Sequence, residues 1–372
     1  MPMVTAYLER SRDVPVHVRR LASPKVASLL YPHMDRIVSL AIKHDDKSWI
    51  PRAAQNLCEP APMLSTLTFY SHPGDFCAVE IPPHFLGGSF PSLRTLVLTE
   101  VSSLARRYTF KNVTTLIWTT TSDLVGQLSR TLDSLPSLEM AIIRFHPLYR
   151  SNFGSADRII TLQHLRTLDL TVNNDPKRGL CGFMLPILPF INLPNLKKLS
   201  LQAGSGFNSR VFPSSVLFAE RLPEFSELSE VAISLLEEDS AKIRLSDSRQ
   251  SELIISVRNI LDVDVTHDFF GGIPYPSVRK LTVRLGTGGY GQASRWVLGV
   301  QRLLIGVEVL EVIGDCAGFL WVWHEEAEYH RICPSLRELA VCGGERYQSQ
   351  LSALAAVRSS VGLPLIITHE IT

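Results

Sequence analysis

The chain has 372 residues, of which 45% are hydrophobic and 20% are charged. This balance is typical of a folded protein and excludes a disordered chain. The 37 Lys and Arg residues nearly equal the 36 Asp and Glu residues, so the composition does not favour a nucleic-acid partner.

Targeting and redox signals point to the inside of the cell. The first six residues, Met1 to Ala6, lack the basic and apolar regions of a signal peptide. The six cysteines are scattered and include no C-x-x-C pair, a pattern that favours reduced thiols. Prolines interrupt the most apolar stretch, residues 180–196, which disfavours a membrane span. We therefore expect a monomer in the cytoplasm or nucleus, without membrane contact.

Residues 1–32 are predicted to form an N-terminal cap or linker, and residues 33–372 a repeat array. The repeated phrase is Pro-x-(Leu/Val)-x-x-(apolar)-x-(apolar). It begins at Pro62, Pro91, Pro136, Pro194, Pro276 and Pro334. Copies without the proline are centred on Leu40, Leu116, Leu168, Val231 and Leu310, with a weaker member at Ile255.

The spacing of these copies predicts the architecture. Their central residues follow one another at intervals of 20 to 32 residues. This is the period of leucine-rich repeats, in which each repeat adds one coil. The sequence therefore predicts an α/β fold: an irregular leucine-rich-repeat solenoid, or horseshoe, with parallel strands on the inner face and helices or loops outside. The copies at Val231 and Ile255 should occupy successive coils.

Helical spacing appears between some of the phrases. Apolar residues from Leu124 to Leu135 predict a helix over residues 123–135, and residues 294–304 and 348–357 show similar patterns. The proline that opens a phrase cannot continue a preceding helix. Asn173 occupies the position where a regular leucine-rich repeat bonds the turning backbone.

Each strand phrase predicts one buried and one open face. Its last two apolar residues are two positions apart, so they lie on the same side of a strand. The alternating residues should project from the sheet, and their rows include Thr68, Val97, Ile117, Ile142 and Thr282. From these rows, the candidate protein-binding residues are Tyr70, Thr99, Thr119, Arg144, Asp169, Lys198, Gln202, Arg284 and Glu311.

Two local patterns offer alternatives based on chemistry. Gly286–Gly291 reads G-x-G-x-x-G after a predicted strand, and such a loop can bind a nucleotide phosphate. It lies within the repeat register and lacks a following βαβ series, so a glycine-rich turn explains it more simply. His324–His330 lacks the second histidine of His-Glu-x-x-His. We therefore predict no catalytic residue, no cofactor and no metal.

Several segments together resemble one protein family. They are Tyr7–Ser11, Val14–Val18, His33–Leu40, Phe90–Leu96 and Leu135–Glu139. They resemble the mushroom-type fungal F-box/leucine-rich-repeat proteins, in which a strand and a first repeat connect the F-box to the solenoid. The resemblance implies the substrate-recognition part of a ubiquitin ligase receptor. No F-box-like segment precedes Tyr7, so binding of the ligase adaptor is expected only if an F-box is restored upstream.

The predicted function is therefore a non-catalytic protein–protein interaction module with an unidentified protein partner. One alternative is a free-standing scaffold or decoy without a ligase role. The other is a nucleotide-binding enzyme that uses residues 286–291.

Overall fold

The structure is a computed structural model. It describes residues 2–21, 23–43, 56–70, 77–79, 84–104, 109–120, 130–145, 159–172, 191–203, 230–236, 240–247, 252–258, 278–285, 305–314, 333–342 and 344–370. The chain divides into two compact units. Unit 1 comprises Met1–Asn173 and Phe190–Asn195, and unit 2 comprises Asn174–Pro189 and Leu196–Thr372.

Unit 1 opens with helix α1 (Pro2–Arg10), strand β1 (Val16–Leu21), helix α2 (Pro24–Leu30) and the 3-10 helix η1 (Tyr31–Arg36). β1 pairs in parallel with β2 (Ile37–Lys43). The sheet of unit 1 therefore begins inside the segment 1–32 that was predicted to be a cap or linker.

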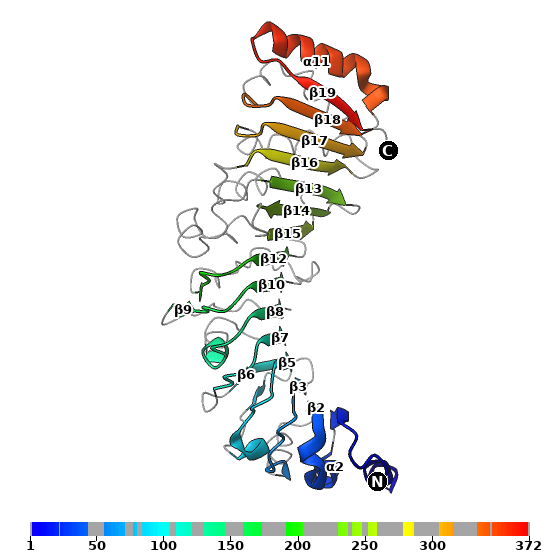
Figure 1. Cartoon of the computed structure of the whole chain (residues 1–372), viewed down its shortest axis with the longest axis vertical. Coiled ribbons are helices and arrows are strands. Elements are labelled where there is room, and N and C mark those ends of the chain that lie inside the picture. Colours follow the sequence, from blue (N-terminus) through cyan, green and yellow to red (C-terminus); the bar gives the residue numbers. More distant parts are fainter. Residues whose placement is uncertain are drawn as a thin grey trace. The chain divides into compact units, whose positions relative to one another are not determined.

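The remaining strands of unit 1 stack in chain order. They are β3 (Thr66–Tyr70), β5 (Thr95–Thr99), β7 (Thr115–Thr120), β8 (Met140–Phe145) and β10 (Thr167–Val172). Their order is β1-β2-β3-β5-β7-β8-β10, and all six neighbouring pairs are parallel (Figure 1). These parallel coils confirm the predicted solenoid.

Short elements lie between these strands. β4 (Cys77–Val79) pairs with β6 (Val101–Leu104), and β9 (Ile160–Thr161) pairs with β11 (Ile191–Asn192). The 3-10 helix η2 covers Phe85–Gly88. Of the helix predicted over residues 123–135, the structure describes 130–135, and residues 130–133 are helical.

Unit 2 contains β12 (Lys198–Ala203), β13 (Glu230–Leu236), β14 (Ser240–Ser246), β15 (Glu252–Arg258), β16 (Lys280–Leu285), β17 (Val309–Gly314), β18 (Glu338–Cys342) and β19 (Ile366–Glu370). The 3-10 helix η7 (Gly344–Tyr347) and helix α11 (Gln348–Ser360) precede β19. α11 confirms the helix predicted over 348–357. The predicted helix over 294–304 lies outside the described residues.

Unit 2 departs from the predicted order at β13–β15. The spatial order is β12-β15-β14-β13-β16, and β14 runs antiparallel to both of its neighbours (Figure 1). The prediction of Val231 and Ile255 in successive parallel coils is therefore wrong. Only residues 237–239 connect β13 to β14, whereas a parallel crossover needs about a dozen residues or more. A tight reversal is the connection that this length allows.

The repeated leucines form the core. Six of the repeated leucines, one from each of six coils, are at most 2% exposed: Leu67, Leu96, Leu168, Leu199, Leu281 and Leu339. All six lie on strands, as predicted. A second buried row follows two residues later, and its largest member is Trp118, whose Nε1 donates to the Val101 carbonyl at 2.8 Å.

The proline of the phrase takes part in a β-turn, a role beyond the helix termination that was expected. It occupies the second position of a β-turn whose first carbonyl accepts from the fourth amide. The Leu64 amide donates to Ala61 at 3.1 Å, and the Leu138 amide donates to Leu135 at 3.2 Å. Because its ring fixes φ near the value this position needs, proline favours the turn directly.

The residue after each turn links one coil to the next. The Arg94 carbonyl accepts from the amides of Thr114 and Thr115 at 2.9 and 3.0 Å. In the same way, the Glu139 carbonyl ahead of β8 accepts from the amides of Arg166 and Thr167 in the next coil, at 2.8 and 3.0 Å. This doubled bond fixes where each strand starts relative to its predecessor.

Side chains in the turn add a second link between coils. Asn112 Nδ2 donates to the Pro91 carbonyl at 2.9 Å, and Asn195 Nδ2 donates to the Gln163 carbonyl at 2.8 Å. Each donor precedes the buried residue of its own turn, and each acceptor is the second residue of the equivalent turn one coil earlier. The bond predicted for Asn173 belongs to the other end of a strand, and this residue lies outside the described residues.

A buried arginine secures the first coil of unit 1. Arg36 is 7% exposed, and its guanidinium donates to the Leu8 carbonyl at 2.5 Å, to Ser11 Oγ at 3.1 Å and to the Val14 carbonyl at 3.4 Å. These acceptors lie at and beyond the end of α1, so one side chain holds the N-terminal helix against the sheet.

Leu96→Ala should lower the free energy of unfolding by roughly 2–5 kcal/mol, because it leaves a cavity under β5. Thr99→Ala, on the half-exposed side of the same strand, should change it by less than about 0.5 kcal/mol. Urea denaturation followed by circular dichroism measures both. Equal effects of the two changes would contradict the assignment of the buried face.

Arg36→Ala should lower the free energy of unfolding by roughly 1.5–3 kcal/mol, because buried carbonyls lose a charged donor. Amide exchange should quicken across residues 2–14 in particular. Arg20→Ala, an exposed change on β1, is the matched control and should affect neither quantity. Unchanged exchange in the Arg36 variant would show that α1 is held by other contacts.

Candidate protein-interaction surface

The alternating residues of β2, β3, β5, β7, β8 and β10 form what we call the open face of unit 1. The strand register arranges them in three rows. The first row is Ser39, Thr66, Thr95, Thr115, Met140 and Thr167. The middle row is Ala41, Thr68, Val97, Ile117, Ile142 and Asp169, and the third is Lys43, Tyr70, Thr99, Thr119, Arg144 and Thr171.

The middle row is apolar for most of its length. Val97, Ile117 and Ile142 are half-buried on three adjacent strands, with their side chains on the side opposite the leucine core. Hydroxyl side chains flank them in both outer rows on β5 and β7. Half-exposed apolar side chains in one contiguous row are unusual on a surface without a binding role.

Larger side chains stand at the borders of this apolar row. Tyr70 on β3 and Met140 on β8 are each 39% exposed. Arg144 is exposed on β8, and Asp169 is half-buried on β10, beside Ile142 in the register. Within the described parts of the chain, neither charged group has an ion pair or side-chain hydrogen bond. Within this part of the chain, both charged side chains can therefore pair with a binding partner.

Some alternating residues are less exposed than predicted. Thr68, Thr171 and Thr282 are only 6%, 8% and 9% exposed. Their side chains are short and lie between strands spaced about 4.8 Å apart, so longer neighbours cover them. The Thr282 hydroxyl also donates to Glu311 Oε2 at 2.9 Å.

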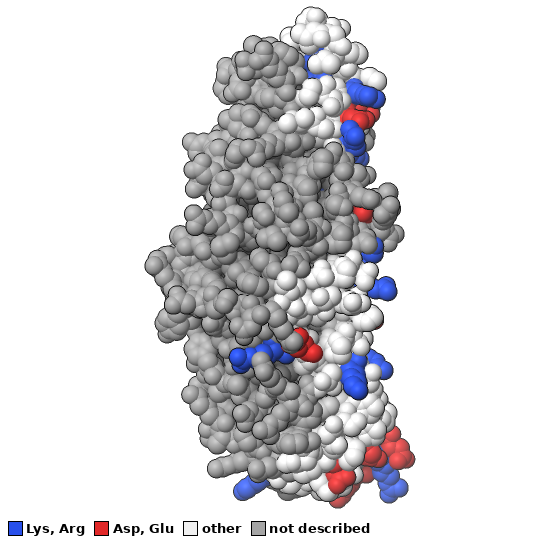
Figure 2. Space-filling model, turned by 90° about the vertical axis from the view of Figure 1, so that its left-hand side faces the viewer, with Lys and Arg blue, Asp and Glu red and all other residues white. Residues whose placement is uncertain are grey.

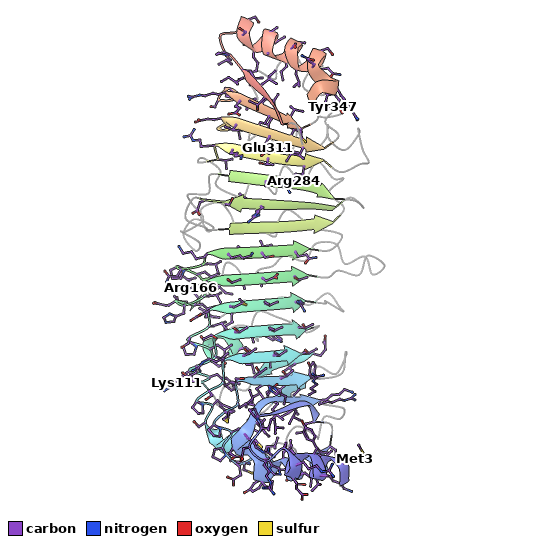
Figure 3. The ribbon with its side chains drawn as sticks, turned by 45° about the vertical axis from the view of Figure 1, so that its right-hand side comes forward. Met3, Lys111, Arg166, Arg284, Glu311 and Tyr347 are labelled. Carbon is purple, nitrogen blue, oxygen red and sulfur yellow. The ribbon has the colours of Figure 1, made fainter. Side chains whose placement is uncertain are left out.

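The equivalent face of unit 2 is charged. Glu311 accepts from Thr282 and pairs with Lys280 Nζ at 3.8 Å, across the β16–β17 pair. Arg284 is exposed one row away, and Figure 3 shows it and Glu311 over these strands. Exposed pairs of this kind contribute at most about 1 kcal/mol, so they define a charge pattern more than they stabilise the sheet.

A mixed-sign margin runs beside the strands where they begin. Arg279 Nη1 pairs with Glu308 Oε1 at 3.1 Å at this margin in unit 2. Figure 3 places Lys111 and Arg166 at the strand-start margin of unit 1. Figure 2 shows basic and acidic side chains following one another along one edge of the described surface. Alternation of the two signs gives no polyanion-binding stripe.

The nine predicted binding residues divide between the two units. Tyr70, Thr99, Thr119 and Arg144 lie side by side in the third row of unit 1, on four adjacent strands. Asp169 belongs to the middle row. Lys198 and Gln202 are exposed on β12 of unit 2, and Arg284 and Glu311 lie in different rows of β16 and β17.

Of the middle row of unit 1, the candidate list named Asp169 and omitted Val97, Ile117 and Ile142, although all of them were expected on the projecting face. Val97, Ile117 and Ile142 look like ordinary strand residues when each copy is read alone. Aligning the copies on their buried leucines brings them into one column, and that alignment is the signal that could have found them.

The motifs weighed for chemistry mostly fall outside the described residues. Both Gly286–Gly291 and His324–His330 do so. The described ranges contain no cluster of three or more His, Cys, Asp or Glu that could hold a metal ion. Nor does any helix in these ranges have the length and hydropathy that crossing a bilayer requires.

The thiol of Cys333, which follows the segment His324–His330, is buried. Cys333 is 1% exposed and is the first residue of the last proline turn. Arg358 of α11 donates to the Cys333 carbonyl at 3.1 Å and to the Leu336 carbonyl at 2.9 Å. Burial raises the pKa of the Cys333 thiol to about 12, and the nearby Arg358 charge opposes this only in part.

Comparison with known proteins finds no family model that matches the chain and no curated protein with significant similarity to it. The geometry of the open faces is therefore the main guide to function.

Cys333 should react with iodoacetamide far more slowly than the half-exposed Cys58 and Cys342 at pH 8, because the thiolate is the reactive form. Its folded pKa lies above the ordinary thiol value of 9.0. The unfolded chain therefore loses this proton first, and stability should fall as pH rises from 9.0 toward about 12. Cys333→Ala should flatten that decline. Peptide mapping by mass spectrometry and alkaline denaturation measure the two effects, and fast labelling of Cys333 in the folded protein would contradict its burial.

Proposed function

We propose that the chain is a non-catalytic protein–protein interaction module that binds a protein partner on the open face of unit 1. The half-buried apolar row Val97, Ile117 and Ile142 carries this proposal. An apolar centre with a polar surround is the usual arrangement of a protein interface.

The residues around this row suit the same role. Tyr, Met and Arg are enriched at interfaces, and Tyr70, Met140 and Arg144 stand at the border of the row. They project from hydrogen-bonded strands, so little backbone freedom is lost when a partner binds. Threonine rarely anchors an interface, and the hydroxyl rows serve here as a polar surround.

Two biological roles use such a surface. The resemblance to F-box/leucine-rich-repeat proteins favours substrate recognition for a ubiquitin ligase, with the adaptor bound through an F-box placed ahead of the solenoid. A free-standing scaffold or decoy would bind the same partner and leave it unmodified. The ubiquitination and half-life of a captured partner, measured with and without the chain, distinguish the two.

Tyr70→Ala combined with Arg144→Ala should weaken capture of a cross-linked partner by about tenfold or more, because truncating an interface anchor typically costs 2 kcal/mol or more. Lys111→Ala combined with Arg166→Ala changes two exposed cations at the strand-start margin and is the matched control. Quantitative mass spectrometry of cross-linked complexes provides the measurement. Capture that survives the first pair and fails with the second would place the interface elsewhere.

A further inference from the structure

We infer that the open face of unit 1 binds an amphipathic α-helix of the partner, lying across the strands with its apolar stripe on Val97, Ile117 and Ile142. This inference rests on the proposed function and specifies the kind of segment that the face accepts.

The spacing of the apolar row matches a helix. The three side chains lie on adjacent strands at one register level, so they are separated by about 4.8 Å and span about 9.6 Å. Helix positions i, i+4 and i+7 rise by about 6 and 10.5 Å, and positions i, i+3 and i+7 by about 4.5 and 10.5 Å. Each turn of the helix can therefore place one apolar side chain against one strand.

An extended peptide does not match this row. Side chains on one face of an extended chain recur about every 6.7 Å, so three of them span about 13 Å. The third would overshoot Ile142 by most of a strand spacing. An extended segment laid along a strand would contact only one member of the row, because the row runs across the strands.

The width of the face also suits a helix. The hydroxyl rows lie two residues to either side of the apolar row, or about 6.7 Å away along the strand. Together they bound a strip about 13 Å wide, close to the 10–12 Å diameter of a helix with side chains. Thr95 and Thr115 on one side, with Thr99 and Thr119 on the other, would meet the polar flanks of the partner helix.

Charge fixes one end of the bound segment. Arg144 and Asp169 lie on the neighbouring strands β8 and β10, and within the described ranges neither has a charged partner. At the other end of the row, Ala41 and Thr68 are small and buried, at 7% and 6% exposed. The fitting helix therefore carries a basic residue that meets Asp169 beyond the end of its apolar stripe, and an acidic residue that meets Arg144 on the flank beside Ile142.

The test uses two displayed peptide pools of equal composition, panned against the full chain. Peptides of about 14 residues, enough to cross five strands, carry leucine at i, i+4 and i+7 in the first pool and at i, i+2 and i+4 in the second. We expect enrichment from the first pool alone. Enrichment from neither pool, or from the second alone, overturns the inference.

Variants then locate the bound peptide. Converting Val97, Ile117 and Ile142 together to Thr keeps β-branched side chains on the strands and should weaken the selected peptide by about tenfold or more. Val309→Thr with Ile313→Thr, half-buried on the open face of unit 2, is the matched control and should leave binding unchanged. Equal binding to the triple variant overturns the inference.

A charge exchange between Arg144 and the peptide tests the inference without altering the apolar row. Arg144→Glu changes an exposed residue, so the fold should persist. It should weaken an acidic selected peptide several-fold, and a peptide with that residue changed to Lys should recover the loss. Failure of the exchange to restore binding counts against the placement of the acidic residue of the helix beside Arg144.

The outcomes separate this inference from the proposed function. A partner whose capture depends on Tyr70 and Arg144, yet is not displaced by the selected helix, removes the helix inference and leaves the interaction surface. A partner whose capture is indifferent to both residues removes the proposed function itself.

Discussion

A backbone carbonyl just ahead of the strand sets the geometry of the parallel coils. In six of the described coils this carbonyl accepts hydrogen bonds from two successive amides of the next coil, and it belongs to Ser65, Arg94, Thr114, Glu139, Arg279 and Glu308. This doubled bond fixes the start of each strand, and the parallel ladder then carries the register along the strand. A slip of one residue would exchange the buried and open faces, so the leucine core and the rows of the open face depend on the same contact.

The outermost coils show how the two units protect their ends. A terminal coil has a flank that no further repeat covers, and solenoids need caps for this reason. Unit 1 uses Arg36 to hold α1, and unit 2 uses Arg358 to hold α11 against the last proline turn. In each case a guanidinium donates to backbone carbonyls that lie outside the hydrogen-bonded ladder of the sheet. The planar group has enough donors to satisfy several of them at once.

Much of the fold could be predicted because the physical cause is local. A phrase such as Pro91–Leu98 contains its own turn and its own buried pair, so its strand is visible in the sequence. The strand β14 escaped prediction because Ile243 and Leu245 belong to no phrase, and their position depends on pairing with Ile233 and Val231. The candidate surface was found strand by strand. Its apolar row emerged only when the register set Val97 beside Ile117, since lateral neighbours are not neighbours in sequence.

The reversed strand β14 limits how this chain can change in length. In a simple solenoid one coil can be lost or duplicated, and its neighbours close the gap with the same ladder. Here β13 pairs with β16 on one side and with β14 on the other, while β15 pairs with β12. Removing β13 or β15 alone would leave β14 antiparallel to β16 or to β12, and removing β14 alone would leave parallel strands in the order β12-β15-β13-β16, which the chain does not follow. No single one of these strands can therefore be lost with the parallel ladder continuing in chain order, and during synthesis β12 waits for residues 252–258 before this edge is paired.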